Sequence, residues 1–144
     1  MKNFIVLFTL MGIFAFGQEK ANMDISQKKE YSILKSKMDL TDVHLNADTI
    51  PEFPGGINAF RQKFNQLIDV SNLDPGRGGT TKTTVFFIIE KDGNVSNIAT
   101  IGDKQYSKEA EKALKQIKNI WKPAILNNEP VRYFFTLPLT MSFE

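Results

Sequence analysis

The chain has 144 residues, enough for one domain with a modest core. Its 18 Lys+Arg against 16 Asp+Glu give a net charge of +2, and no Lys/Arg cluster is interleaved with aromatic residues, which argues against nucleic-acid binding. The absence of cysteine excludes disulfides, thiol chemistry and cysteine-ligated metals.

Residues 1–17 have the pattern of a signal peptide. Lys2 precedes an apolar run over 4–16, and Ala15-Phe16-Gly17 places small residues where an exporting peptidase reads, so Gln18 is the expected mature N-terminus. The alternative is an uncleaved inner-membrane anchor. At about 1.5 Å per residue, however, the run spans roughly 20 Å, short of the ~30 Å hydrocarbon core. The pattern favours export with cleavage of the leader.

Residues 18–50 are predicted to form a tether or a weakly formed helix. The segment is polar and lysine-rich, contains neither proline nor glycine, and spaces its apolar residues poorly for one helix. We therefore expect it to bury little. It also contains His44, the only histidine, which has no Cys or His partner for a metal.

A domain over 51–144 is predicted to begin with a corner and a helix. Pro54 fixes φ, and Gly55 and Gly56 allow conformations that are closed to other residues. The apolar stripe of the following helix consists of Ile57, Phe60, Phe64, Leu67 and Ile68.

A β-hairpin is predicted next. Residues 83–90 are apolar on both faces, which indicates a central strand covered on each side. Asp92 and Gly93 supply a turn that tolerates positive φ, and 95–101 form the return strand.

A second helix follows the hairpin. Ser107 is its predicted cap, and its apolar face consists of Ala110, Ala113, Leu114 and Ile117. Trp121 is predicted to close this helix as a core residue, and Pro123 to stop it.

The last predicted strand covers 131–143 and has one buried face. Its odd-numbered residues are all apolar or aromatic, and Phe134 makes the second face partly apolar. Proline is tolerated mainly at sheet edges, so Pro138 indicates that one side of this strand is free to receive a strand from another chain. The predicted partner-binding residues are Arg132, Phe134, Thr136, Pro138, Thr140 and Ser142.

These elements predict an α+β fold with a mixed, largely antiparallel three-stranded sheet. A right-handed crossover through the second helix places the last strand beside the first, so the strand order is second, first, third, with both helices on one face.

Six pieces of the sequence, in this order and spacing, resemble the TonB C-terminal domain in the form common in Bacteroidetes-type bacteria. They are Pro-Glu-Phe-Pro-Gly-Gly (51–56), Val-Phe-Phe-Ile-Ile-Glu-Lys-Asp-Gly-Asn-Val (85–95), Glu-Ala-Glu-Lys-Ala-Leu (109–114), Trp-Lys-Pro-Ala (121–124), Asn-Glu-Pro-Val (128–131) and Phe-Thr-Leu-Pro-Leu (135–139). The resemblance implies an envelope domain that pairs a short segment of an outer-membrane transporter against its last strand, in support of transmembrane transport.

The chain departs from energy transducers of that family in two ways. Its apolar run is short, and residues 18–50 lack the proline-rich spacer of a stiff rod. We therefore favour a periplasmic binding module over a membrane-anchored transducer.

Two other classes of function are a self-associating scaffold and an enzyme. A self-associating scaffold would dimerise through the second sheet face, using Phe86, Ile88 and Phe134. An enzyme would need a nucleophile–base pair or clustered carboxylates, whereas the acids here are scattered, so we expect neither catalysis nor a cofactor.

Overall fold

The computed structural model describes residues 24–71, 73 and 79–143. The predicted signal peptide, 1–17, and residues 18–23 of the predicted tether lie outside this range. Within it, no helix has the length and apolar character that crossing a membrane requires.

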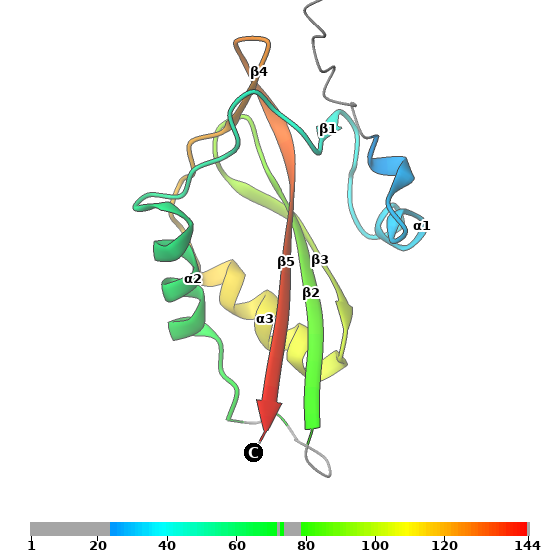
Figure 1. Ribbon diagram of the computed structural model, residues 1–144, viewed down its shortest axis with the longest axis vertical. Coiled ribbons are helices and arrows are strands. Elements are labelled where there is room, and N and C mark those ends of the chain that lie inside the picture. The colour runs from blue at the N-terminus through cyan, green and yellow to red at the C-terminus, as the bar shows by residue number, and fades with distance from the viewer. Residues whose placement is uncertain (1–23, 72, 74–78, 144) are drawn as a thin grey trace, which may run out of the picture.

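The fold is α+β, with a mixed five-stranded sheet in the order β1-β5-β2-β3 and with β4 paired to β5 (Figure 1). The elements are the 3-10 helix η1 (Ile25–Gln27), α1 (Tyr31–Leu34), β1 (Val43–His44), α2 (Gly56–Leu67), β2 (Gly79–Ile89), β3 (Val95–Gly102), α3 (Lys104–Gln116), β4 (Ala124–Leu126) and β5 (Glu129–Phe143).

Strand β2 lies between β3 and β5, and it pairs antiparallel with both. Its residues 85–89 are all buried, which is the environment that their two apolar faces require. The prediction of three strands is wrong, because β1 and β4 also pair with β5. These strands have two and three residues, too few to show a periodic pattern in the sequence.

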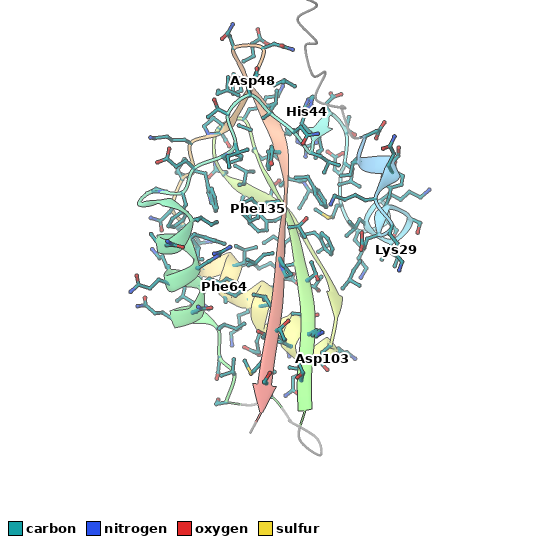
Figure 2. The ribbon with its side chains drawn as sticks, viewed as in Figure 1. Lys29, His44, Asp48, Phe64, Asp103 and Phe135 are labelled. Atoms are coloured by element: carbon teal, nitrogen blue, oxygen red, sulfur yellow. The ribbon has the colours of Figure 1, made fainter. Side chains whose placement is uncertain are left out.

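Helices α2 and α3 cover one face of the sheet and form the larger core with it. An aromatic cluster lies at its centre: the Trp121 ring centroid is 5.0 Å from that of Phe60, 5.1 Å from that of Phe53 and 5.5 Å from that of Phe135. Figure 2 shows Phe64 and Phe135 in the space between α2 and the sheet. Trp121 is thus a core residue.

The second face of the sheet is covered by residues 25–45, so the prediction of a tether that buries little is wrong. Ile25, Leu34 and Met38 pack with Phe86, Ile88, Ala99 and Phe134 in a second core. The segment makes short helical turns instead of one helix, and for that reason its apolar residues have irregular intervals.

The same packing bears on the predicted self-association surface. Phe86, Ile88 and Phe134 are at most 4% exposed, because the chain's own N-terminal segment lies over them. In this structure they are unavailable to a second copy.

The boundaries of α3 differ from the prediction. Its N-cap is Asp103, whose side chain accepts a hydrogen bond of 2.8 Å from the Tyr106 amide. Ser107 lies inside the helix, where its hydroxyl bonds that of Thr83 at 2.6 Å in the core. The helix ends at Gln116, so Trp121 does not close it and Pro123 does not stop it. Both residues lie in the stretch that leads into β4.

The two predicted turns form as expected. Gly55 caps α2 with a φ of 85°, directly after Pro54, and Gly56 follows with a φ of 84°. In the hairpin, the Asp92 carboxylate accepts the Asn94 amide at 3.0 Å, and Gly93 has a φ of 83°.

We expect Leu34→Ala to lower the free energy of unfolding by about 2–5 kcal/mol, because it opens a cavity in the second core. Ile33→Ala is the matched control. That side chain is 46% exposed, so its loss should cost about 0.5 kcal/mol or less. Urea unfolding measures both, and equal small effects would show that residues 25–45 do not pack on the sheet.

Gly93→Ala should destabilise the protein much more than Gly56→Ala, although both residues have positive φ. A Cβ at Gly93 would lie 1.9 Å from the Trp121 carbonyl oxygen, whereas nothing lies within 4 Å of one at Gly56. Gly56→Ala should cost only the conformational strain of about 1–3 kcal/mol. Thermal unfolding of the two variants measures the difference, and equal losses would contradict the close approach at Gly93.

Candidate functional site

One edge of β5 is open over residues 134–143. On one side, β5 pairs with β2 from Tyr133 to Phe143. On the other, β1 pairs with Arg132 and Tyr133. The residues before them, 129–131, pair with β4. Beyond Tyr133, β2 is the only described strand that pairs with β5. We call residues 134–143 the open edge.

The position of Pro138 indicates which backbone groups face outward. It lies opposite Thr84, in a register with β2 that runs unbroken from Gly79 to Ile89. Because proline has no N–H, and prolines in sheets are confined to positions whose nitrogen points away from a partner, we infer that the Pro138 nitrogen faces the open edge. Backbone groups alternate along an antiparallel pair, so even-numbered residues present their N–H and C=O groups to the open edge.

Five of the six predicted binding residues lie on this edge, and four of them are exposed. Thr136, Pro138, Thr140 and Ser142 are all exposed along it. Phe134 begins the edge, but its side chain is only 4% exposed, beneath the N-terminal segment. Phe134 can therefore offer its backbone groups, and its ring is mostly covered.

Arg132 is not a free binding residue, contrary to the prediction. Its Nε donates to Glu90 Oε2 at 2.8 Å and its Nη2 to Glu90 Oε1 at 3.0 Å. Its Nη1 reaches the Asp39 carboxylate at 3.4 Å and bonds the Thr41 carbonyl. The side chain is only 14% exposed, so the guanidinium is used within the fold.

A second hydrogen bond fixes the same part of the N-terminal segment. Asn97, at a φ of 50° where the β2–β3 register shifts, accepts the Asp39 amide through its Oδ1 at 2.9 Å. The sequence gives no signal that Asp39, Glu90 and Asn97 meet, because they are far apart along the chain. Together with Arg132 they form a clip that fastens residues 39–41 to the sheet.

The hydrogen bonds of the clip shift the pKa values of Glu90 and Arg132. The two hydrogen bonds from Arg132 hold the pKa of Glu90 below its ordinary value of 4.5, and the Ser96 hydroxyl acts in the same direction. The bonds to Glu90 raise the pKa of Arg132 in turn. Each charge thus favours the ionised form of the other.

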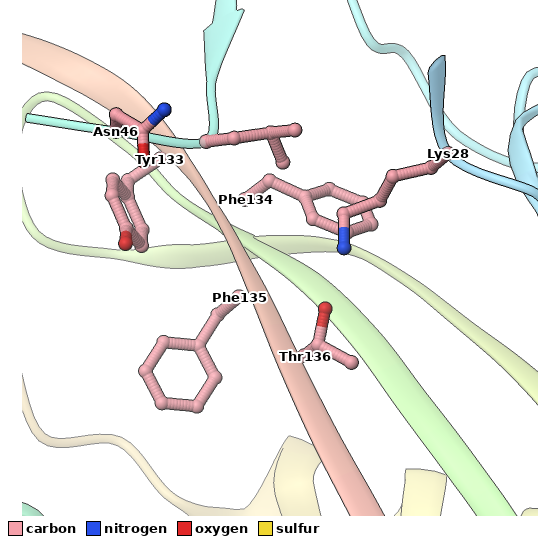
Figure 3. Close-up of a pocket in the computed structure, with 7 residues that line it drawn as sticks. Lys28, Asn46, Tyr133, Phe134, Phe135 and Thr136 are labelled. Carbon is pink, nitrogen blue, oxygen red and sulfur yellow. The ribbon is translucent and has the colours of Figure 1, made fainter. Parts of the chain in front are cut away.

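Two depressions lie beside the open edge, and the first is lined by residues from both faces of β5. The first has a volume of about 330 Å³ (Figure 3). It lies beside β5, next to the residues that directly follow β1. It is lined by Lys28, Leu45, Asn46, Tyr133, Phe134, Phe135 and Thr136. The second, of about 160 Å³, lies between α2 and β5 and is lined by Phe60, Arg61, Phe64, Asn65, Leu137, Pro138 and Leu139.

Among the described residues, no group of three or more His, Cys, Asp or Glu side chains could hold a metal ion. The chain matches no known family model, and a search of curated proteins finds no similar sequence. The open edge and its two depressions are therefore the features from which a function can be inferred.

Glu90→Gln should lower the free energy of unfolding at neutral pH. It should also make that free energy depend less on pH in the acidic range. Because the pKa of Glu90 is depressed in the folded state, its contribution is fully present above the unfolded value near 4.5 and is lost as the pH falls through the folded pKa. We expect a loss on the order of 1–3 kcal/mol at pH 7 that shrinks toward zero in acid.

Urea unfolding between pH 7 and pH 2 measures this difference. The control is Glu129→Gln, since that side chain is exposed on the β4–β5 hairpin. A stability gap between Glu90→Gln and the parent protein that stays constant over the whole range would contradict the role of Glu90 ionisation.

Proposed function

We propose that the protein is a binding module of the cell envelope that captures an extended segment of a protein partner as an added strand beside β5. The observation that carries this proposal is the open edge, which has one unpaired side over residues 134–143. Strand addition gives affinity through backbone hydrogen bonds, and pockets on the two faces give specificity for alternate side chains.

The composition of the open edge supports the proposal. Exposed edge strands are normally protected by charges, prolines or covering loops, because an unpaired ladder invites association. Residues 134–143 contain no charged residue and only one proline, Pro138. Above this stretch the edge is already filled by β1, which sets where an incoming strand can begin.

The two depressions also support strand addition. Successive side chains of an added strand point to opposite faces of the sheet. The depression beside Thr136 can receive side chains on one face, and the depression beside α2 can receive those on the other.

The resemblance to the TonB C-terminal domain favours the periplasm as the location and a segment of an outer-membrane transporter as the partner. Force transmission through a long spacer is less well supported. The part of 18–50 that would have to act as the spacer includes residues 25–45, which pack on the sheet and are held by the Arg132 clip. We therefore propose a role in transport through binding, with no enzymatic activity.

Single proline substitutions at 139–142 test the proposal. Leu139→Pro and Met141→Pro remove N–H groups that face Thr83 and Thr81 on β2, and should destabilise the fold by about 1–3 kcal/mol or more. Thr140→Pro and Ser142→Pro remove N–H groups from the open edge, and should keep the fold while abolishing capture of the partner.

Capture is measured by crosslinking in the host envelope from a photoreactive residue placed at position 136, and stability by thermal unfolding. Thr140→Val is the control, because it alters the side chain and keeps the backbone donor. If Thr140→Pro and Ser142→Pro fold and capture the partner as well as Thr140→Val does, the open edge is not the binding surface.

A further inference from the structure

We propose that the segment captured at the open edge is acidic, and that Lys28 and Arg61 recognise its carboxylates from opposite faces of the added strand. This inference rests on the proposed strand addition and concerns the chemistry of the partner. The inference follows from the positive charges near the open edge, which itself contains no charged residue.

Two cations flank the open edge, and a third lies one strand away from it. Lys28 lines the first depression, where its amino group lies 5.6 Å from the centroid of the Phe134 ring (Figure 3). Arg61 is exposed on α2 and lines the second. Lys82 is exposed on β2 opposite Thr140, so β5 lies between it and a strand added at the open edge.

Among the described residues, no acidic side chain forms an ion pair with these cations. Neither depression is lined by an acidic residue, and α2 contains none along its whole length. None of the described ion pairs includes Lys28, Arg61 or Lys82. The three charges are therefore available to a ligand.

The alternation of side chains assigns each cation to a different position of the partner. A partner residue opposite Thr136 would point to the face that carries Lys28, because Thr136 itself lies on that face. A residue opposite Leu137 would point to α2 and Arg61. Lys28 and Arg61 would thus contact neighbouring residues of the partner, whereas Lys82, one strand farther away, adds positive charge to the face that carries Lys28.

The same charges disfavour a second copy of this chain as the occupant. Edge-to-edge pairing of two β5 strands would bring two sets of Lys28, Arg61 and Lys82 together with no acid between them. Like charges across a strand pair are destabilising, whereas opposite charges stabilise the pair and speed association. An acidic extended segment would present carboxylates to both Lys28 and Arg61.

The test is selection of random extended peptides, displayed on phage, against the purified protein. We expect the selected peptides to be enriched in Asp and Glu at neighbouring positions. For one selected peptide made synthetically, Lys28→Glu and Arg61→Glu should each weaken binding on the order of 2–10-fold in fluorescence anisotropy, and added salt should weaken binding to the parent protein. Lys118→Glu, on an exposed residue beyond α3, is the matched control and should have little effect.

Thr140→Pro separates this inference from the proposed function. Peptides that need the Thr140 N–H yet show no acidic enrichment, and that bind Lys28→Glu and Arg61→Glu unchanged, would overturn the acidic partner and leave strand addition standing. Failure to select any peptide that is sensitive to Thr140→Pro would overturn both. Acidic peptides that lose affinity in all three variants, and keep it in Lys118→Glu, would support both.

Discussion

The antiparallel ladder between β2 and β5 is the constraint on which the rest of the structure depends. It runs without interruption from Gly79↔Phe143 to Ile89↔Tyr133. Because a strand has only two sides, this ladder uses one side of β5 along its whole lower part and leaves the other side unpaired. It also fixes which side chains face α2 and α3 and which face the N-terminal segment, since residues alternate between the two faces.

The N-terminal segment, residues 25–45, covers one face of the sheet and supplies one of its strands. It covers the apolar residues Phe86, Ile88 and Phe134, and it donates β1 to the upper end of β5. The bidentate pair of Arg132 with Glu90 holds it there, because the same guanidinium reaches Asp39 and Thr41. Geometry of this kind is stronger than a single ion pair at the surface. The segment therefore decides both which sheet face is closed and where the open edge begins.

The proposed function uses the backbone groups of β5 that neither the β2–β5 ladder nor the N-terminal segment pairs. The unpaired groups of β5 lie between α2 on one face and Lys28 on the other, so a strand added there would be recognised by its backbone and by both rows of its side chains. A module of this kind needs no catalytic group. It needs a rigid edge, and β5 is made rigid by the β2 ladder and by the aromatic cluster of Phe135, Phe60 and Trp121 behind it.

The sequence by itself determined the elements whose signal is local. The alternation over 131–143, the two apolar faces of 83–90, the Asp92-Gly93 turn and the stripe of α2 each depend on residues close together in the chain, so their periods are visible without a structure. Thr136, Pro138, Thr140 and Ser142 were identified as edge residues for the same reason. The tertiary structure alone decided what lies next to them. Arg132 and Phe134 look exposed in the alternation, and they are covered by residues far earlier in the sequence, whose short turns have no period to reveal that they pack. Lys28 and Arg61 reach the open edge only after folding, because the ladder between β2 and β5 brings distant segments to its two faces.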